Sequence, residues 1–258
     1  MSPVIPITPA NATKSCATVA AKCSLCSFNR LCLPQGLADD DVARLDQIIA
    51  RRRRVGRDEP LYQTGDSFHS LYAVRFGHFK TVQVNQRGEQ TIGGFHMAGD
   101  LLGMEAIGNG QHSCNAVALE DSEVCEIPFS RLQELVMQIP GLLQQFHRTM
   151  SREIQREQSV MLFLSHMRAE QRLAMFLLNL AGRYAQRGYS STSFQLRMSR
   201  EDIGGYLGLT VESVSRQLAR LRQDGSIVLN NRDLRIVDRN KLEVMSSGGM
   251  AQEYAAVA

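Results

Sequence analysis

Residues 199–223 read SREDIGGYLGLTVESVSRQLARLRQ, and this stretch decides the fold of the C-terminal part of the chain. Ser199 and Asp202 have the spacing of a capping box, so we expect a helix to begin just after Ser199. Gly208 suits the left-handed turn that ends such a helix, and Thr210 can cap a second helix over the rest of the stretch. Two helices joined by a short turn that contains glycine are the signature of a helix-turn-helix.

The second helix of this motif has an apolar face and a polar face. At 3.6 residues per turn, its valines and leucines at positions 211, 214, 218 and 221 share one side. This apolar side would pack on the rest of the domain. An arginine offers two donors to guanine and a glutamate accepts from cytosine, so the polar side suits a DNA major groove. We favour this interpretation over an ordinary solvated face because a capped helix and a glycine turn precede it. The residues expected to contact DNA are Glu212, Ser213, Ser215, Arg216 and Arg220.

The residues after this helix predict a β-hairpin, which would make the motif a winged helix-turn-helix. Apolar residues at positions 227–229, 234 and 236 flank the turn-forming pair Asn230–Asn231. Arginines beside such a hairpin can contact DNA phosphates without reading the base sequence. The candidates here are Arg232, Arg235 and Arg239.

Alternating apolar residues between about positions 61 and 127 indicate strands. Tyr72, Val74 and Phe76 are expected on one side of a strand. Turn-forming pairs such as Gly99–Asp100 interrupt the pattern every eight to twelve residues or so, which is typical of an antiparallel sandwich or barrel.

One long helix is predicted for residues 141–167, roughly 40 Å at 1.5 Å per residue, after Pro140 closes a short helix from about Ser130. Residues at heptad spacing form a seam along it: Leu143, His147, Met150, Ile154, Glu157, Met161 and Leu164. Such a seam can pack on its own domain or on a second copy of the chain. We favour a dimer interface, because a long helix between two domains has little of its own chain to lie on. A carboxylate on the seam would face its symmetry mate and make the association marginal.

Three closely spaced cysteines, Cys23, Cys26 and Cys32, predict a metal centre, because cytosolic cysteines seldom form disulfides. A site of thiolate ligands needs a fourth member, and spacing alone does not choose it from Cys16, Cys114 and Cys125. Spacing also leaves zinc and an iron–sulfur cluster open. In its apolar surroundings, Cys125 can equally be a small buried residue.

Composition places the chain among globular proteins of two domains. It has 258 residues, 43% hydrophobic and 21% charged, and no apolar run approaches the roughly 20 residues of a membrane-spanning helix. The first residues lack the basic and apolar regions of a secretory signal, so we expect a cytoplasmic protein. The net charge of +3 permits nucleic-acid binding through a local patch without requiring it. The basic run Arg51–Arg54 is interpreted as a solvated helix end.

The sequence contains no nucleophile–base constellation and no glycine-rich phosphate loop, so an enzyme is not expected. Its histidines are scattered singly, as surface or core histidines usually are. Residues 1–22 and 246–258 are polar or small and without apolar periodicity, and both ends are expected to be poorly ordered.

The chain resembles the FNR family, the fumarate and nitrate reduction regulators of the larger cyclic-AMP-receptor-like superfamily. The likeness runs from about Cys23 to Asp238. Four stretches carry it: CSLCSFNRLC (23–32), GFHMAGD (94–100), CEIPF (125–129) and IGGYLGLTVESVSR (203–216). The resemblance implies an α+β fold with three parts. These are a cluster-binding segment with a cyclic-nucleotide-binding-like β jelly roll (23–140), a dimerisation helix (141–167) and a winged helix-turn-helix DNA-binding domain (168–245).

The resemblance also implies the ligands and the partners. An oxygen-labile 4Fe-4S cluster would be held by Cys23, Cys26, Cys32 and Cys125. A homodimer paired through Met150, Ile154, Glu157 and Met161 would bind double-stranded DNA. Base reading by Glu212, Ser215 and Arg216 implies a TTGAT half-site and its inverted partner. Glu157 falls where the family carries an acidic residue that keeps the cluster-free form monomeric.

Two further expectations follow from this resemblance. The turn Gln86–Glu89, through Gly88 and Glu89, resembles a loop that contacts RNA polymerase. Residues 108–114 offer no arginine for a cyclic phosphate, so no cyclic nucleotide is expected to bind.

The expected protein is thus an oxygen-responsive global transcription regulator that activates or represses genes when oxygen is absent. One alternative is a zinc-bound or constitutive regulator with the same DNA-binding head, which metal analysis would distinguish. The other is a regulator that senses another small ligand in the β domain, in which case a nucleotide would shift its melting temperature.

Overall fold

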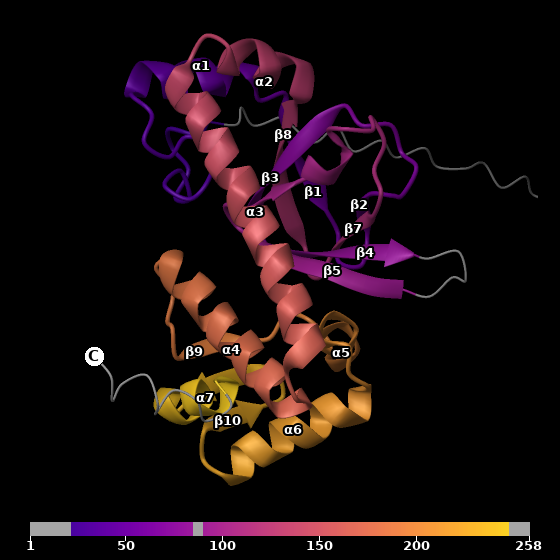
Figure 1. Cartoon of the computed structure of the whole chain (residues 1–258). Coiled ribbons are helices and arrows are strands. Elements are labelled where there is room, and N and C mark those ends of the chain that lie inside the picture. The colour runs from indigo at the N-terminus through magenta and orange to yellow at the C-terminus, as the bar shows by residue number, and fades with distance from the viewer. Residues whose placement is uncertain (1–21, 85–89, 248–258) are drawn as a thin grey trace, which may run out of the picture.

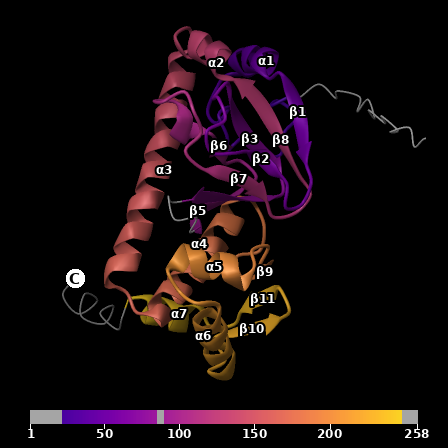
Figure 2. The same ribbon diagram turned by 90° about the vertical axis from the view of Figure 1, so that its right-hand side faces the viewer.

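The computed structural model describes residues 22–84 and 90–247, apart from the side chains of residues 159, 160 and 162–166. An N-terminal β unit and a C-terminal, mostly helical unit lie along one long helix, α3 (Pro140–His166) (Figures 1 and 2). The fold is α+β, as the sequence predicted. No helix of the described residues is long and apolar enough to cross a membrane.

The β unit is a sandwich of two antiparallel four-stranded sheets. The order of the first sheet is β1 (Arg51–Val55), β8 (Ser122–Pro128), β3 (Ser70–Phe76) and β6 (Leu101–Leu102). The order of the second is β2 (Pro60–Tyr62), β7 (Asn115–Ala118), β4 (His78–Val84) and β5 (Gln90–Met97). Val74 and Val124 of the first sheet and Phe79 of the second are buried in one apolar core. Burying both inner faces in this way is what stabilises a sandwich.

The outer face of the first sheet is covered by helices. Leu71 and Ala73 of β3 share a core with α1 (Asp39–Ile48), α2 (Phe129–Val136) and the first turns of α3. β3 is therefore buried on both faces, and the expected alternation fails at Phe76. A register shift between Val74 and Phe76 turns the Phe76 side chain outward, where it is 61% exposed.

The interpretation of Arg51–Arg54 as a helix end is wrong, because these residues form most of β1 and pair with β8. The Nε atom of Arg51 lies 2.7 Å from a carboxylate oxygen of Glu126, and Glu123 of the same strand lies within ion-pair distance of Arg54. Opposite charges across a strand pair stabilise the sheet. The glutamates come from far along the chain, so local sequence does not reveal this pairing.

Pro140 opens the long helix rather than closing the short one. The helix α2 ends at Val136, and Pro140 is the first residue of α3. A proline is favourable there, because the first amides of a helix have no intrahelical acceptor. Leu142, Gln145 and Phe146 then form a buried face that packs on the β unit.

The C-terminal unit is a winged helix-turn-helix, which confirms the prediction. Its elements are α4 (Ala169–Gln186), β9 (Ser193–Gln195), α5 (Arg200–Leu207), α6 (Val211–Gln223), β10 (Ile227–Asn230), β11 (Asp233–Ile236) and α7 (Arg239–Ser246). The Ser199 hydroxyl accepts from the Asp202 amide and the Asp202 carboxylate accepts from the Ser199 amide, as expected for a capping box. Gly208 has a φ of 62°, and Thr210 caps α6. The predicted hairpin forms, with β9 as its third strand.

The two units share one hydrophobic core. Val82 and Phe95 of the second sheet are buried together with residues of α4, α5 and α6. The backbone of α5 approaches β5 so closely that a Cβ atom on Gly205 would lie 3.0 Å from Ile92. An ion pair of 2.5 Å joins Lys80 of β4 to Asp202 of α5. The helix-turn-helix is therefore docked on the sandwich.

Candidate metal centre and nucleic-acid interface

The N-terminal cysteines lie on a loop of successive turns before α1. The amide of Cys26 donates to the carbonyl of Cys23 at 3.0 Å, and the amide of Cys32 donates to the carbonyl of Phe28 at 3.2 Å. The Asp46 carboxylate on α1 accepts from the backbone amide of Cys23 and from the Ser24 hydroxyl. These contacts fix the loop, and sequence reasoning missed the role of Asp46 because it lies far along the chain from the cysteines that it anchors.

Four cysteines of the described chain line one small cavity between this loop and β8: Cys23, Cys26, Cys32 and Cys125. Cys125 reaches it from the middle of β8, where it pairs with Ala73. Apolar side chains, among them Leu33, Leu45 and Ile127, line much of this cavity, together with the charged Lys22 and Arg75. The structure thus brings together residues that are about a hundred positions apart in sequence, in a setting that excludes much of the water.

Cys114 does not line this cavity. It is buried on the inner side of the sandwich and borders a different cavity, together with Tyr62 and Glu105. Cys16 lies outside the described residues. Among the described cysteines, Cys125 is therefore the one that accompanies the loop cysteines.

The chemistry of these donors fits a cationic centre. Burial, followed by the proximity of Cys26, raises the pKa of Cys125 to about 11. Burial likewise raises the pKa of Cys32 to about 12, and it raises that of Cys23. Thiols of this kind stay protonated at neutral pH unless a metal displaces the protons, because only the thiolate is a ligand.

The cysteines around this cavity are not grouped as the ligands of one bound ion are. Among the described residues, no group of three or more His, Cys, Asp or Glu is arranged to hold one metal ion. Zinc–sulfur bonds of about 2.3 Å would bring tetrahedral thiolates to within about 4 Å of one another. In a 4Fe-4S cluster each thiolate binds its own iron, so four cysteines around one cavity can stand further apart.

The polar face of α6 is open to solvent. Glu212 and Arg216 are exposed, and Arg216 donates to the Ser213 hydroxyl at 3.3 Å. Hydrogen bonds from its own backbone amide and from Thr210 lower the pKa of Glu212, so its side chain is an acceptor at neutral pH. Ser215 accepts from Arg200 at 3.1 Å, a residue of α5 that sequence reasoning did not single out. This face presents donors and acceptors of the kind that read bases in a major groove.

Arg220 is placed differently from the other predicted base-reading residues. Its Nη1 atom forms an ion pair of 2.6 Å with Glu170 in the first turn of α4. It is still 64% exposed, so DNA can compete for it. The predicted phosphate contacts Arg232, Arg235 and Arg239 are exposed on and after the wing, and Arg239 pairs with Glu243.

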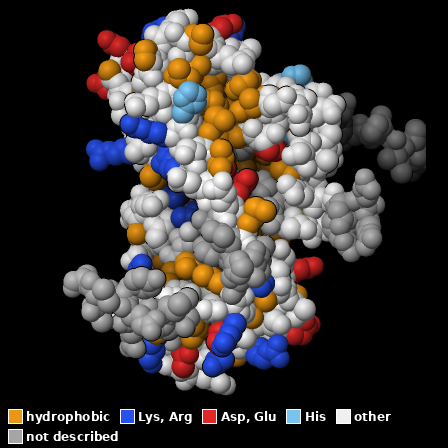
Figure 3. Space-filling model, viewed as in Figure 1, with side chains coloured by type: hydrophobic (Ala, Val, Ile, Leu, Met, Phe, Trp, Pro, Cys, Tyr) orange, Lys and Arg blue, Asp and Glu red, His pale blue; other side chains and the backbone are white. Residues whose placement is uncertain are grey.

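The seam predicted along α3 is largely exposed, although Met150 also packs on the core of the β unit. Ile154 and Met161 are 51% and 68% exposed, Glu157 is exposed and Met150 is half-buried. Figure 3 shows hydrophobic side chains gathered on the side of the molecule where α3 lies. The side chain of Leu164 is outside the described part. An exposed row of apolar side chains on a long helix is typical of a helix–helix interface.

Two other predictions concern the β unit. Gly88 and Glu89, the predicted polymerase contact, lie outside the described residues. A cavity of about 210 Å³ between the sheets and α3 is lined by residues that include Tyr62, His96 and Glu105. No arginine is among the described residues around it. We still predict that no cyclic nucleotide binds to this protein.

Comparisons with known proteins extend these observations. Residues 52–139 match the family of cyclic nucleotide-binding domains, and residues 171–245 match that of Crp-like helix-turn-helix domains. The transcriptional regulatory protein btr of Bordetella pertussis is 47% identical over 219 residues, which cover 85% of this chain and 90% of that protein. The fumarate and nitrate reduction regulatory protein of Escherichia coli K12 is 44% identical over 223 residues, which cover 86% and 89%.

Solved structures show the same architecture. FixK2 from Bradyrhizobium japonicum is similar with a TM-score of 0.70 and 28% identity, over 75% of this chain and 96% of that chain. A CRP-family transcriptional regulator from Thermus thermophilus is similar with a TM-score of 0.62 and 25% identity, over 76% and 96%.

Proposed function

The chain belongs to the Crp/FNR family of transcription regulators, which are not enzymes, and on this basis we propose that it is an oxygen-responsive regulator. In this proposal it binds palindromic DNA as a homodimer when it carries a 4Fe-4S cluster. The single observation that carries the proposal is the convergence of Cys23, Cys26, Cys32 and Cys125 on one cavity, in a chain with an exposed reading helix.

The four cysteines would hold the cluster, which when bound would supply a link between loop and sandwich that oxygen can break. Cys125 lies on β8 of the first sheet, and the other three lie on the loop that Asp46 anchors to α1. The loop also contacts the DNA-binding unit, because the ring centroids of Phe28 and Tyr189 lie 6.4 Å apart. Its position can therefore bias both the β unit and the DNA-binding unit.

The exposed seam of α3 would form the dimer interface. Pairing of two copies through Ile154 and Met161 would put the two α6 helices on one side of the dimer, as a palindromic site requires. Glu157 would face its symmetry mate, and the like charges would keep the dimer marginal, so that a small change in loop position decides between monomer and dimer.

The base contacts would come from α6. Glu212, Ser215 and Arg216 would read a TTGAT-type half-site, with Ser213 and Arg220 beside them. The exposed wing arginines would bind phosphates and set the register. RNA polymerase would be contacted by the turn that holds Gly88 and Glu89.

Metal analysis of two cysteine variants tests the proposal. The protein is purified without oxygen, and iron, acid-labile sulfide and zinc are measured for the natural chain, Cys125→Ser and Cys114→Ser. We expect near-stoichiometric iron and sulfide in the natural chain and in Cys114→Ser, with a visible absorption that bleaches in air. Cys125→Ser should lose both elements, because a serine hydroxyl is a poor ligand for iron in such a cluster.

Other results would contradict specific parts of the proposal. Zinc in place of iron would remove oxygen as the signal and leave the DNA-binding assignment standing. A cluster lost in Cys114→Ser and kept in Cys125→Ser would overturn the ligand set.

A further inference from the structure

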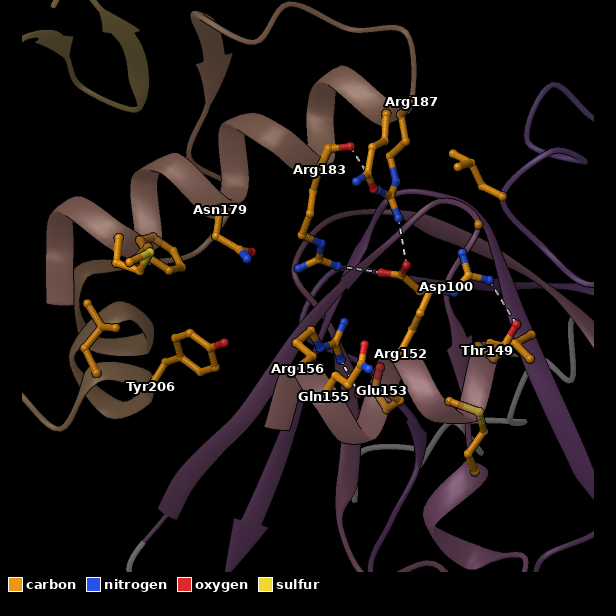
Figure 4. Close-up of a pocket in the computed structure, with 18 of the residues that line it drawn as sticks. Asp100, Thr149, Arg152, Glu153, Gln155, Arg156, Asn179, Arg183, Arg187 and Tyr206 are labelled. Atoms are coloured by element: carbon orange, nitrogen blue, oxygen red, sulfur yellow. Dashed lines mark hydrogen bonds and ion pairs between the residues drawn. The ribbon is translucent and has the colours of Figure 1, made fainter. Parts of the chain in front are cut away.

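A third cavity, of about 300 Å³, lies where the two units meet. It is bordered by the turn Gly99–Asp100, by α3, by α4 and by α5 (Figure 4). None of the residues around it is one of the four cysteines, and none belongs to the polar face of α6. The cavity is thus distinct from the polar face of α6 and from the four cysteines, although Gly99 borders both this cavity and that of the cysteines. Its size falls at the lower end of the range for small-molecule pockets.

The lining of this cavity carries more positive than negative charge. Its arginines come from α3, from α4 and from the residue that follows α4: Arg152, Arg156, Arg172, Arg183 and Arg187. Among the described residues of the lining, the carboxylates are Asp100 and Glu153. Asp100 already forms ion pairs with two arginines, Arg183 at 2.6 Å and Arg187 at 2.7 Å. Glu153 forms an ion pair with Arg156. The remaining positive potential in a partly enclosed space attracts an anion.

Neutral donors face the same space. Figure 4 shows the amide of Asn179, the hydroxyl of Tyr206 and the guanidinium groups of Arg156 and Arg183 around the open centre of the cavity. Within the described part of the chain, the Asn179 amide and the Tyr206 hydroxyl make no side-chain hydrogen bond. The Tyr206 ring is held by packing against Phe95 and Phe176, with centroids 5.1 and 5.9 Å away. The ring packing therefore fixes the position of the Tyr206 hydroxyl, which has no hydrogen-bond partner among the described residues.

We propose that this cavity binds a small molecule carrying a diphosphate or similar multiply charged phosphate group. Guanidinium groups match the oxygens of a phosphate with paired donors. The Asn179 amide and the Tyr206 hydroxyl add two neutral donors. The cavity is large enough for more than a single phosphate. This site requires neither the cluster nor the DNA target of the proposed function.

Such a ligand would join α3 to two helices of the C-terminal unit, beside the turn Gly99–Asp100 of the β unit. Arg156 lies on α3, Asn179 and Arg183 lie on α4, and Tyr206 lies on α5, next to the reading helix. Because binding and docking of the units are linked, the ligand stabilises the docked arrangement and the docked arrangement raises its affinity. Binding of this ligand would thereby regulate docking of the DNA-binding unit independently of oxygen.

Calorimetric titration of the full-length protein with inorganic pyrophosphate tests the proposal, at fixed ionic strength and without DNA. We expect one site per chain. Tyr206→Phe, which keeps the ring and removes only the hydroxyl, should weaken binding about tenfold, as should Asn179→Ala. Arg54→Gln removes one positive charge from a strand of the β unit, outside the cavity lining, and should bind as the natural chain does. Melting curves show that the variants are folded.

Three results would overturn it. Equal affinity in Tyr206→Phe, Asn179→Ala and Arg54→Gln would mean diffuse attraction to a basic protein. Loss of binding only in Arg216→Ala would assign the pyrophosphate to the DNA-binding face. Equal affinity for citrate at the same ionic strength would show that the cavity selects carboxylates as readily as phosphates.

Discussion

The carboxylate of Asp100 lies 2.7 Å from Nη2 of Arg187, and this contact joins the β unit to the DNA-binding unit. The same turn touches the cysteine loop, because a Cβ atom on Gly99 would lie 2.9 Å from that of Leu31. A short path of contacts therefore leads from the cysteines to α4 within one chain. A change in the loop can reach the DNA-binding unit through this turn as well as through pairing of α3.

Asp100→Asn should destabilise the protein by about 3 kcal/mol, because it removes the carboxylate and leaves Arg183 and Arg187 facing each other without it. Chemical denaturation of the natural chain and the variant measures this difference. Asp58→Asn, at an exposed surface turn, is the control and should change the free energy of unfolding by less than about 0.5 kcal/mol. Equal stability of all three proteins would show that the Asp100 contacts are not needed for docking.

Stability should also fall at acid pH through Asp100. Burial alone would raise the pKa of this carboxyl, but Arg183, Arg187 and Arg156 more than offset that and hold it well below its usual range. The stabilisation is therefore complete above the unfolded-state pKa of about 4 and is lost as the pH falls towards the folded-state value. Melting temperatures from pH 6 to pH 2 should separate the natural chain from Asp100→Asn least at the acid end. A constant difference across this range would contradict the ion-pair account.

Gly204→Ala should disrupt the helix-turn-helix. A Cβ atom at this position would lie 2.6 Å from the backbone oxygen of Leu209, in the turn before α6. Relief of this clash requires a backbone shift and should cost about 2 kcal/mol. Gly182→Ala is a matched control in α4, since nothing lies within 4 Å of the added atom, and it should be neutral or stabilise by up to about 1 kcal/mol. Urea denaturation of both variants compares them, and equal effects would argue against the close approach.

Arg216→Ala should weaken binding to the specific palindrome by about 1–3 kcal/mol per half-site and leave binding to random DNA nearly unchanged. The exposed position of this residue on the polar face of α6 is the reason. Fluorescence anisotropy with both DNAs at several salt concentrations measures the effect. Arg235→Ala on the wing should instead weaken binding to both DNAs alike. Equal losses for Arg216→Ala on the two DNAs would make Arg216 a phosphate contact.

Glu157→Ala should increase dimerisation of the cluster-free protein, because it removes like charges from the exposed seam of α3. We expect the dimer dissociation constant to fall by about tenfold, measured by sedimentation equilibrium. Gln158→Ala, the neighbouring exposed residue off the seam, should leave it unchanged. If both variants dimerise like the natural chain, α3 does not pair through Glu157.

Local features of this protein could be predicted because the contacts behind them span only a few residues. The capping box at Ser199 and the left-handed turn at Gly208 depend on neighbours within about four positions, and the wing hairpin forms around a turn of adjacent residues. The apolar face of α6 follows from helix periodicity in the same way. The cysteine spacing indicated metal chemistry, since thiolate ligands are a property of residue type.

Tertiary structure alone decided which side chains from distant segments meet. Cys125 joins the loop cysteines and Cys114 does not, because sheet register places one on the outer side of the sandwich and the other inside it. The same long-range pairing makes Arg51–Arg54 a strand. The contact of Asp100 with Arg183 and Arg187 also requires two separately folded units to dock. These relationships depend on packing between elements, for which a residue's sequence neighbours carry no signal.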